Sequence, residues 1–96
     1  MASETKETKQ ANYVFVGKKG VMAYVLAVFT QFGAGAKEVI IKARGKSISS
    51  AVDVAEIVRN KQTDIKLKSI EISTEEVQTE DGRPLNVSAI SITMKK

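Results

Sequence analysis

The hydrophobic pattern of the first half of the chain predicts a short strand followed by an apolar helix. Residues 13–16 form a run of β-branched and aromatic side chains, which is typical of a buried strand, and Gly17 ends it. Residues 21–32 are apolar on almost every side and rich in Ala, Leu and Met, which favours a helix over a strand. A helix of this kind must be covered on more than one side, so the pattern also predicts a self-association surface.

The pattern then predicts a second strand and a second helix. The alternation in residues 38–44 puts Val39, Ile41 and Ala43 on one face. Ile40, Lys42 and Arg44 project from the other face. We expect the next helix to begin at Ser47 or Ser50, because residues 50–53 resemble a capping box with Asp in place of Glu. One apolar stripe follows helical spacing along this helix and is formed by Ile48, Ala51, Val52, Ala55 and Val58.

The C-terminal third has the pattern of a long hairpin. Two alternating arms, residues 65–77 and 85–94, flank an Asp-Gly turn. The apolar phase slips by one residue midway along both arms, which predicts a bulge or a strong bend in two matched strands. The elements together predict an α+β fold, a two-layer α/β sandwich of order β-α-β-α-β-β with a long C-terminal hairpin. We expect one domain over residues 12–96, preceded by a polar, disordered tail at residues 1–11.

Charge is distributed unevenly along the chain and gathers in two clusters. Residues 12–46 carry six basic side chains and one acid, whereas residues 47–96 carry seven basic side chains and eight acids. The excess lies in residues 17–20 and 42–46, each placed where a predicted strand ends and a helix follows. If the two strands are parallel neighbours, both clusters lie at the edge where open α/β sheets place their ligands. This arrangement favours binding of a polyanion over a merely solvated basic surface.

Composition and motifs argue against catalysis. The chain contains no His and no Cys, and most protein nucleophile, general-base and transition-metal chemistry needs one of them. Asp53 and Glu56 lie near the start of a helix and are interpreted as ordinary dipole residues, not as a catalytic pair. The loop at residues 17–20 lacks the Gly-x-x-x-x-Gly-Lys pattern of a nucleotide P-loop. We therefore expect no enzyme activity, no cofactor and no metal site, and a small nucleotide-binding enzyme is the least favoured alternative.

The residue types favour contacts to phosphate groups over contacts to bases. All five aromatic side chains lie in apolar runs and are expected in the core, which argues against a single-strand stacking platform. The hairpin carries mixed charge, and Arg83 near its tip is its best contact residue. Sequence-tolerant binding of a duplex fits these observations best. The longest apolar stretch is about half the length needed to span a bilayer, so we expect no membrane partner.

Three segments of the chain closely resemble one known family. They are VFVGKKGVMAYVLA at residues 14–27, IKARGKSIS at residues 41–49 and AVDVAEIVRN at residues 51–60. In these segments the chain is similar to the Alba family, the small basic chromatin proteins of archaea, and the resemblance extends over residues 12–96. It implies an Alba-like fold similar to the C-terminal domain of a bacterial translation initiation factor. It also implies a cytoplasmic, chromosome-associated homodimer that binds and condenses double-stranded DNA, and often binds RNA, with little sequence preference.

The resemblance also implies roles for individual residues. The nucleic-acid contacts would come from six cationic side chains, Lys18, Lys19, Lys42, Arg44, Lys46 and Arg83. Lys18 and Lys19 would lie at the DNA-facing centre of the dimer. Acetylation there, by an acetyltransferase and reversed by a deacetylase, would remove phosphate-neutralising charge.

Two positions depart from the family pattern. Gly20 stands where many members have a proline, so the helix start is less rigid. Gln62 stands where many have an aromatic residue used between dimers, which predicts weak cooperative packing along DNA. An RNA chaperone or RNA-processing subunit stays open as the alternative function, because backbone contacts do not separate the two polymers.

Overall fold

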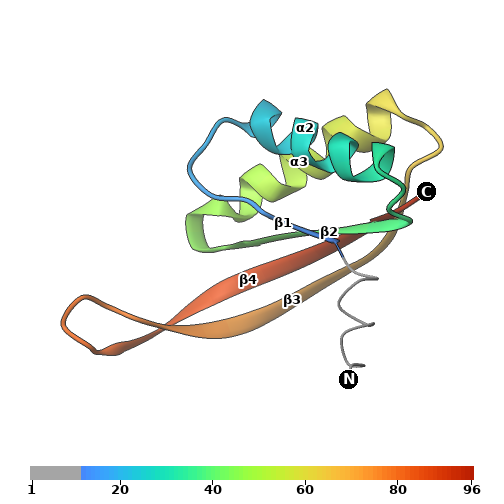
Figure 1. The fold of residues 1–96 in the computed structure, drawn as a ribbon. Helices are drawn as coiled ribbons and strands as arrows, with labels where there is room; N and C mark the ends of the chain where they lie inside the picture. The colour runs from blue at the N-terminus through green and yellow to red at the C-terminus, as the bar shows by residue number, and fades with distance from the viewer. Residues whose placement is uncertain (1–11) are drawn as a thin grey trace, which may run out of the picture.

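The protein folds into two layers, a four-stranded sheet with two α-helices packed on one of its faces (Figure 1). The computed structural model describes residues 12–96, and the tail predicted at residues 1–11 lies outside the described residues. In chain order the elements are β1 (Asn12–Phe15), α2 (Val21–Gly33), β2 (Glu38–Arg44), the 3-10 turn η2 (Gly45–Ser47), α3 (Ile48–Lys61), β3 (Lys66–Gln78) and β4 (Pro84–Lys95). The predicted α+β class and the β-α-β-α-β-β order are confirmed.

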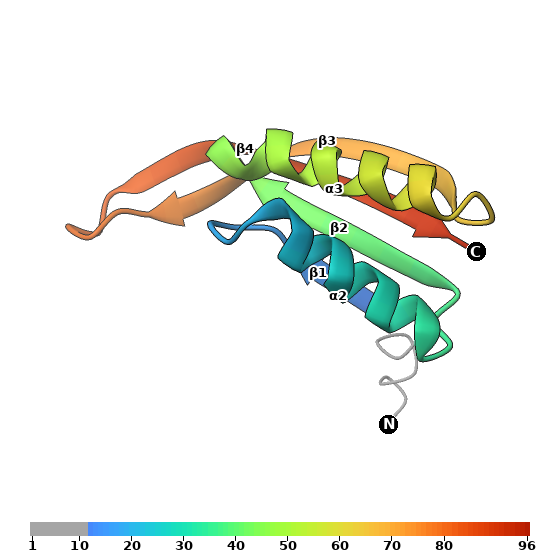
Figure 2. The ribbon, with the colours of Figure 1, turned by 90° about the horizontal axis from the view of Figure 1, so that it is seen from above.

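The strands lie in the order β1-β2-β4-β3. β1 and β2 are parallel, as the argument from the two charge clusters required, and the other neighbouring pairs are antiparallel. Because β1 and β2 run the same way, the loops that leave them emerge at the same end of the sheet. The hairpin of β3 and β4 extends past this end, beyond the helices (Figures 1 and 2).

The core lies between the helices and the covered face of the sheet. Its side chains come from both helices and from strands β1, β2 and β4, chiefly Val14, Val25, Val28, Val39, Ile41, Val54, Val58, Ile92 and Met94. On α3 the buried stripe has helical spacing and runs through Ala51, Val54, Ala55 and Val58. Val52, which the sequence analysis placed in this stripe, is 42% exposed, because it lies one residue off the buried line. None of the helices within residues 12–96 is long and apolar enough to cross a membrane.

Of the two helix starts predicted for α3, Ser47 and Ser50, the structure supports Ser47. Ser47 is the N-cap residue, but its side chain makes no capping hydrogen bond. The capping box predicted at residues 50–53 is wrong, because Ser50 already lies within the first turn of the helix. The chain enters α3 through the tight turn η2, in which Gly45 has a φ of 59°. A side chain at that φ is strained, so the glycine permits the turn.

The hairpin has one irregularity where the sequence predicted two. In β3 a bulge lies between Leu67, paired with Met94, and Ser69, paired with Thr93. β4 pairs with β2 without interruption, so the phase slip in the apolar pattern of this arm does not mark a bulge. It arises because Ala89 is buried on the face opposite the core, beside its cross-strand partner Arg44.

Candidate nucleic-acid interface

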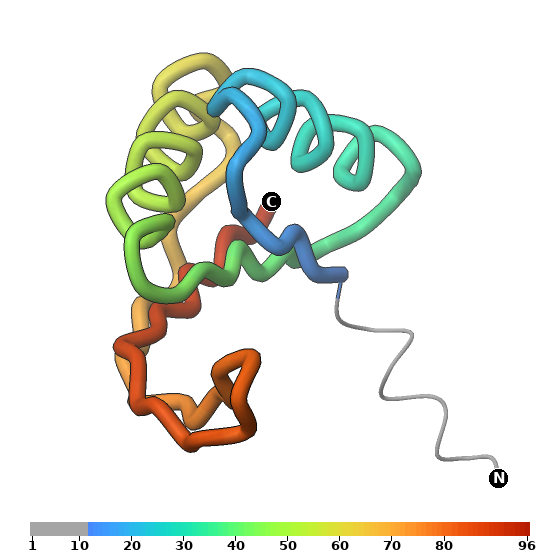
Figure 3. The backbone as a smooth tube through the Cα atoms, turned by 90° about the vertical axis from the view of Figure 1, so that its left-hand side faces the viewer, coloured from blue at the N-terminus to red at the C-terminus, as the bar shows by residue number. Residues whose placement is uncertain are grey.

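The two predicted cationic clusters lie at one end of the sheet. Phe15 pairs with Lys42 in the parallel ladder, and the Val16 N–H donates to the Lys42 carbonyl at 2.8 Å. The two chain segments therefore leave the sheet side by side, one into the Lys18-Lys19 loop and the other into η2. Figure 3 looks onto this end, where both turns and the curved hairpin face the viewer. The two clusters lie at the same end of the sheet, as predicted, because β1 and β2 are parallel.

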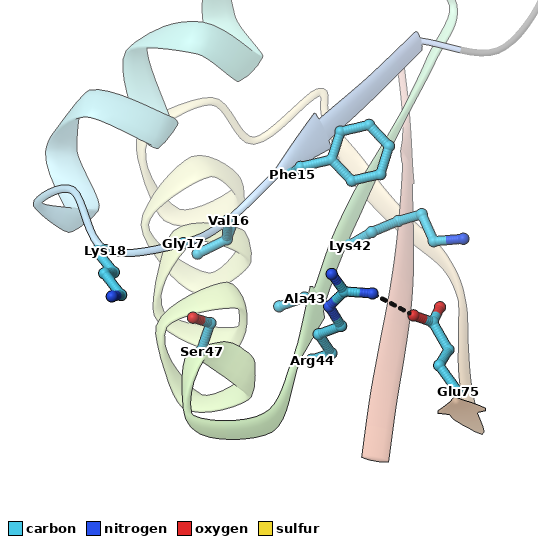
Figure 4. Close-up of a pocket in the computed structure, with 9 residues that line it drawn as sticks. All are labelled: Phe15, Val16, Gly17, Lys18, Lys42, Ala43, Arg44, Ser47 and Glu75. Atoms are coloured by element: carbon cyan, nitrogen blue, oxygen red, sulfur yellow. Dashed lines mark hydrogen bonds and ion pairs between the residues drawn. The ribbon is translucent and has the colours of Figure 1, made fainter. Parts of the chain in front are cut away.

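Three of the six predicted cations line one hollow. It has a volume of about 500 Å³ and is lined by Phe15, Val16, Gly17, Lys18, Lys42, Ala43, Arg44, Ser47 and Glu75. Figure 4 shows Lys18 on the β1–α2 loop at one side, with Lys42 and Arg44 projecting from β2 at the other. Lys19 and Lys46 are exposed on the adjoining turns, and Arg83 is exposed near the hairpin tip, so none of these three lines the hollow.

The lysine loop is held in place by a residue that the sequence analysis assigned only to the core. The hydroxyl of Tyr24 accepts a hydrogen bond from the Gly17 N–H at 2.9 Å and another from the Lys19 N–H at 3.2 Å. Its ring packs against the core while its oxygen reaches the loop. A Tyr instead of a Phe in an apolar helix was the available signal, because a buried ring with a hydroxyl usually has a polar partner.

The start of α2 adds a partial positive charge next to the lysines. Gly20 is the N-cap residue, no side chain caps the helix, and no acidic residue occupies its first turn. The Ala23 N–H donates to the Gly20 carbonyl at 3.1 Å, so the N–H groups of Val21 and Met22 are the ones available to an anion, which the helix dipole favours. Gly20 itself has a φ of −64°, which is the value that proline imposes. Gly20 thus has the backbone φ that a proline at this position would impose.

Acidic partners hold two of the six cations. Arg44 pairs with Glu75 of β3 at 3.1 Å, and Arg83 pairs with Asp81 at 3.1 Å. A hydrogen bond from the Thr79 hydroxyl, together with Arg83, holds the pKa of Asp81 below its usual value. Within residues 12–96, the other four predicted cations, Lys18, Lys19, Lys42 and Lys46, form no ion pair. A phosphate can therefore bind these lysines directly, whereas at either arginine it competes with a carboxylate for the guanidinium.

Two aromatic side chains are exposed, contrary to the prediction that all five lie in the core. Phe15 is 70% exposed and Tyr13 is 45% exposed. They point away from the helices because the alternation of β1 turns Val14 toward the core. Their rings are stacked at 5.8 Å between centroids, and the Lys42 Nζ lies 5.7 Å from the centroid of Tyr13. The sequence-based argument against a stacking platform therefore does not hold.

The outer side of α2 also carries exposed apolar side chains. Met22 is 56% exposed and Leu26 is 65% exposed. Both lie on a helix that contains no charged residue. The predicted self-association surface would include these residues, and self-association stays a prediction. Gln62, the other departure from the family pattern, is the exposed C-cap residue of α3.

The fold and the site define a small α+β domain with a cationic edge, made by two strand-to-helix turns beside a protruding hairpin. The family model of Alba matches residues 12–74, and the chain belongs to the Alba family. The resemblance noted in the sequence is thereby confirmed.

Relatives and solved structures cover nearly the whole described chain. DNA/RNA-binding protein Alba 1 of Archaeoglobus fulgidus is 60% identical over 86 residues, which cover 88% of this chain and 96% of the relative. DNA/RNA-binding protein Alba of Methanocella arvoryzae is 57% identical, with 88% and 90% covered. The structure of Alba from Thermoplasma volcanium superposes with a TM-score of 0.83 at 56% identity, covering 88% of this chain and all of that chain. ALBA1 from Trypanosoma brucei superposes with a TM-score of 0.73 at 30% identity, covering 88% of this chain and 68% of that chain.

Proposed function

We propose that the protein is a non-enzymatic architectural chromatin protein that binds double-stranded DNA largely without sequence specificity. The observation that carries the proposal is the set of lysines and arginines at one end of the sheet, three of which line one hollow. The names of the archaeal relatives, DNA/RNA-binding protein Alba, support nucleic acid as the polyanion. We expect the protein to act in the cytoplasm, on the chromosome.

Contacts to phosphate explain the residue types at this end. Lys18, Lys19 and Lys46 are exposed cations on turns, and no ion pair with another residue of the range 12–96 orients them toward a base edge. Flexible cations of this kind neutralise phosphates and do not read sequence. The hairpin would lie along the duplex, and Arg83, whose side chain is 81% exposed, would reach the minor groove.

The proposal includes a homodimer formed through the uncharged side of α2, where Met22 and Leu26 are exposed. A dimer doubles the cations that face one duplex, and we expect six to eight of them to contact phosphates. Each released counterion contributes about −0.9 to the slope of log affinity against log salt, so the slope should be roughly −5 to −7. A salt titration of binding to a mixed-sequence duplex measures this slope, and a value near zero would refute phosphate-dominated binding.

Binding of RNA is the second candidate function. It is favoured by the relatives' names, which include RNA, and by the phosphate contacts, which do not separate the two polymers. Affinities for matched duplex DNA and duplex RNA at one salt concentration discriminate the two. Clear preference for RNA would make an RNA chaperone or RNA-processing subunit the better description.

Regulation by acetylation forms the last part of the proposal. Lys18 and Lys19 are exposed on a turn and so accessible to an acetyltransferase and a deacetylase. Acetylation would remove one charge from each modified lysine and weaken binding to any phosphate backbone. Acetyl-lysine incorporated at position 18 should reduce duplex affinity and flatten the salt slope by about 0.9 for each phosphate that is no longer neutralised. Unchanged binding would exclude this mode of regulation.

A further inference from the structure

The exposed aromatic pair on β1 has no role in phosphate binding. Phe15 is 70% exposed at the rim of the cationic hollow, and Tyr13 stacks beside it. Large aromatic rings are usually buried, and an exposed ring with cations close by marks an interaction site. Phe15 adjoins Lys42 across the parallel ladder, and the Lys42 ammonium lies over the Tyr13 ring. The rings and the cations therefore form one surface.

This surface is the open face of the sheet, opposite the helices (Figures 1 and 3). Directly paired residues of neighbouring strands share a face, so the register defines what lies there. Next to Lys42 comes Ser91, and next to Ile40 comes Thr93. The open face thus has an aromatic edge on β1, cations on β2 and small hydroxyl side chains on β4. Hydroxyl groups can donate to and accept from the polar edges of bases.

We propose that this open face, which we call the β1 platform (Tyr13, Phe15, Lys42 and Ser91), binds unpaired bases of a single-stranded nucleic acid. A base stacks on the ring of Phe15, and the phosphates on either side of it bind Lys42 and Lys18. The hollow of about 500 Å³ beside Phe15 falls within the range of about 300–1,000 Å³ that is typical of small-molecule sites. Stacking accepts any base, because every base has a π-face, so the site requires no particular sequence. The proposal deepens the function proposed above, on which it rests, and adds single strands to its substrates.

A second copy of the chain fits this face less well than a single strand does. Burying Phe15 against a protein would also bury Lys42 and the Arg44–Glu75 pair at the same hollow, and desolvating charged groups is costly. The side of α2 that exposes Met22 and Leu26 carries no charge and provides a better self-association surface. A nucleic-acid strand satisfies both parts of the platform, since its bases stack on the ring and its phosphates neutralise the cations.

Duplexes and single strands would use different parts of the protein. In a duplex the bases are stacked on one another and only the backbone is presented, so a duplex contacts the cations and leaves Phe15 free. In a single strand the bases can turn out and stack on aromatic side chains. Removal of the aromatic ring should therefore weaken single-strand binding selectively, whereas removal of a lysine should weaken both.

The test compares Phe15→Leu, which keeps apolar area but removes the π-face, with Phe15→Tyr, which keeps both. Binding of a 12-nucleotide single strand and of a 12-base-pair duplex is measured by fluorescence anisotropy at one salt concentration. Removal of a stacking ring weakens binding by about 5- to 160-fold per base, which corresponds to about 1–3 kcal/mol. We expect Phe15→Leu to lower single-strand affinity by at least 5-fold and duplex affinity by less than 2-fold, with Phe15→Tyr close to the unsubstituted protein. Because Phe15 is exposed, we expect both variants to fold, and circular dichroism checks this.

The outcomes separate this proposal from the proposed function. Duplex binding with single-strand affinity unaffected by Phe15→Leu overturns the β1 platform and leaves the duplex function standing. Selective weakening on the single strand, in a protein that does not bind the duplex, supports the platform and refutes the duplex function. Weakening of both affinities together with a change of oligomeric state in analytical ultracentrifugation shows that a second copy covers Phe15, and this overturns the proposal. As an independent readout, a single strand carrying 4-thiouracil should crosslink to the peptide that contains Tyr13 and Phe15, and crosslinking only elsewhere also overturns it.

Discussion

Glu75 of β3 holds Arg44, one of the three cations that line the hollow, in an ion pair, and its removal should tighten binding. The Arg44 Nη1 lies 3.1 Å from the Glu75 Oε1, and the two side chains are 60% and 37% exposed. A phosphate bound by Arg44 competes with this carboxylate for the guanidinium and lies near it. The substitution Glu75→Gln keeps the shape of the side chain and removes its charge.

The magnitude of the effect has two contributions. An exposed ion pair contributes about 0.2–1 kcal/mol, which binding no longer has to overcome. A carboxylate about 6 Å from a phosphate repels it by about 0.7 kcal/mol in water. Together they come to about 1 kcal/mol, which corresponds to about fivefold tighter binding for each protomer that contacts the duplex. The salt slope should also steepen by about 0.9 for each Arg44 that newly neutralises a phosphate.

The same strand provides a matched control, because Glu71 lies on the same face of β3, directly opposite Ser91. Within residues 12–96, Glu71 forms no ion pair, so Glu71→Gln removes one negative charge without releasing a cation. Fluorescence anisotropy with a 20-base-pair duplex, at several salt concentrations from 50 to 300 mM, compares both variants with the unsubstituted protein. If Glu75→Gln binds the duplex no more tightly than Glu71→Gln does, the ion pair between Glu75 and Arg44 does not weaken duplex binding, and the reasoning is wrong.

Three further variants test the lysine loop. Lys18→Ala with Lys19→Ala should weaken duplex binding equally for all sequences and flatten the salt slope by about 1 for each phosphate left without its lysine, and an unchanged slope would refute the central role of these lysines. Tyr24→Phe removes the hydroxyl that binds the Gly17 and Lys19 N–H groups, so we expect about 1 kcal/mol less stability in urea unfolding and weaker duplex binding. Normal stability with weaker binding would show that the hydroxyl positions the loop without supporting the fold. Gly20→Pro should raise the free energy of unfolding by up to about 1 kcal/mol, because Gly20 already has proline's φ and a Cβ there meets nothing within 4 Å. A lower midpoint of urea unfolding would contradict this.

The elements that the sequence predicted best are those with a clear period. The alternation in β2 predicted its buried face, formed by Val39, Ile41 and Ala43, and the common direction of Lys42 and Arg44. β1 is only four residues long and almost entirely apolar, so its sequence does not indicate which side chains face the core. Which of its faces is covered depends on the position of the helices, and this is why Phe15 was wrongly assigned to the core.

The contacts that tune the site could not be read from the sequence. Arg44 and Glu75 are separated by 31 residues in the sequence, and they meet because β4 pairs with both β2 and β3, so that the two side chains reach each other across β4. Charge counting along the chain treats Glu75 as part of a neutral hairpin, whereas in the structure it faces the basic hollow. The bulge between Leu67 and Ser69 was predictable from the phase of the apolar residues, because an extra residue shifts every later side chain to the other face.

The distribution of charge and apolar surface links the proposed dimer to the proposed interface. α2 has no charged residue, yet it begins directly after the Lys18-Lys19 loop. Association through its exposed side, near Met22, would therefore bring the two lysine loops of a dimer close to each other. Two like-charged loops repel, and this repulsion is relieved when a phosphate backbone lies across them. Binding of a polyanion should then strengthen the dimer, because the ligand removes the repulsion between protomers. Dimer dissociation measured with and without a short duplex tests this coupling, and equal dissociation constants in both conditions would show that the lysine loops do not meet at the dimer axis.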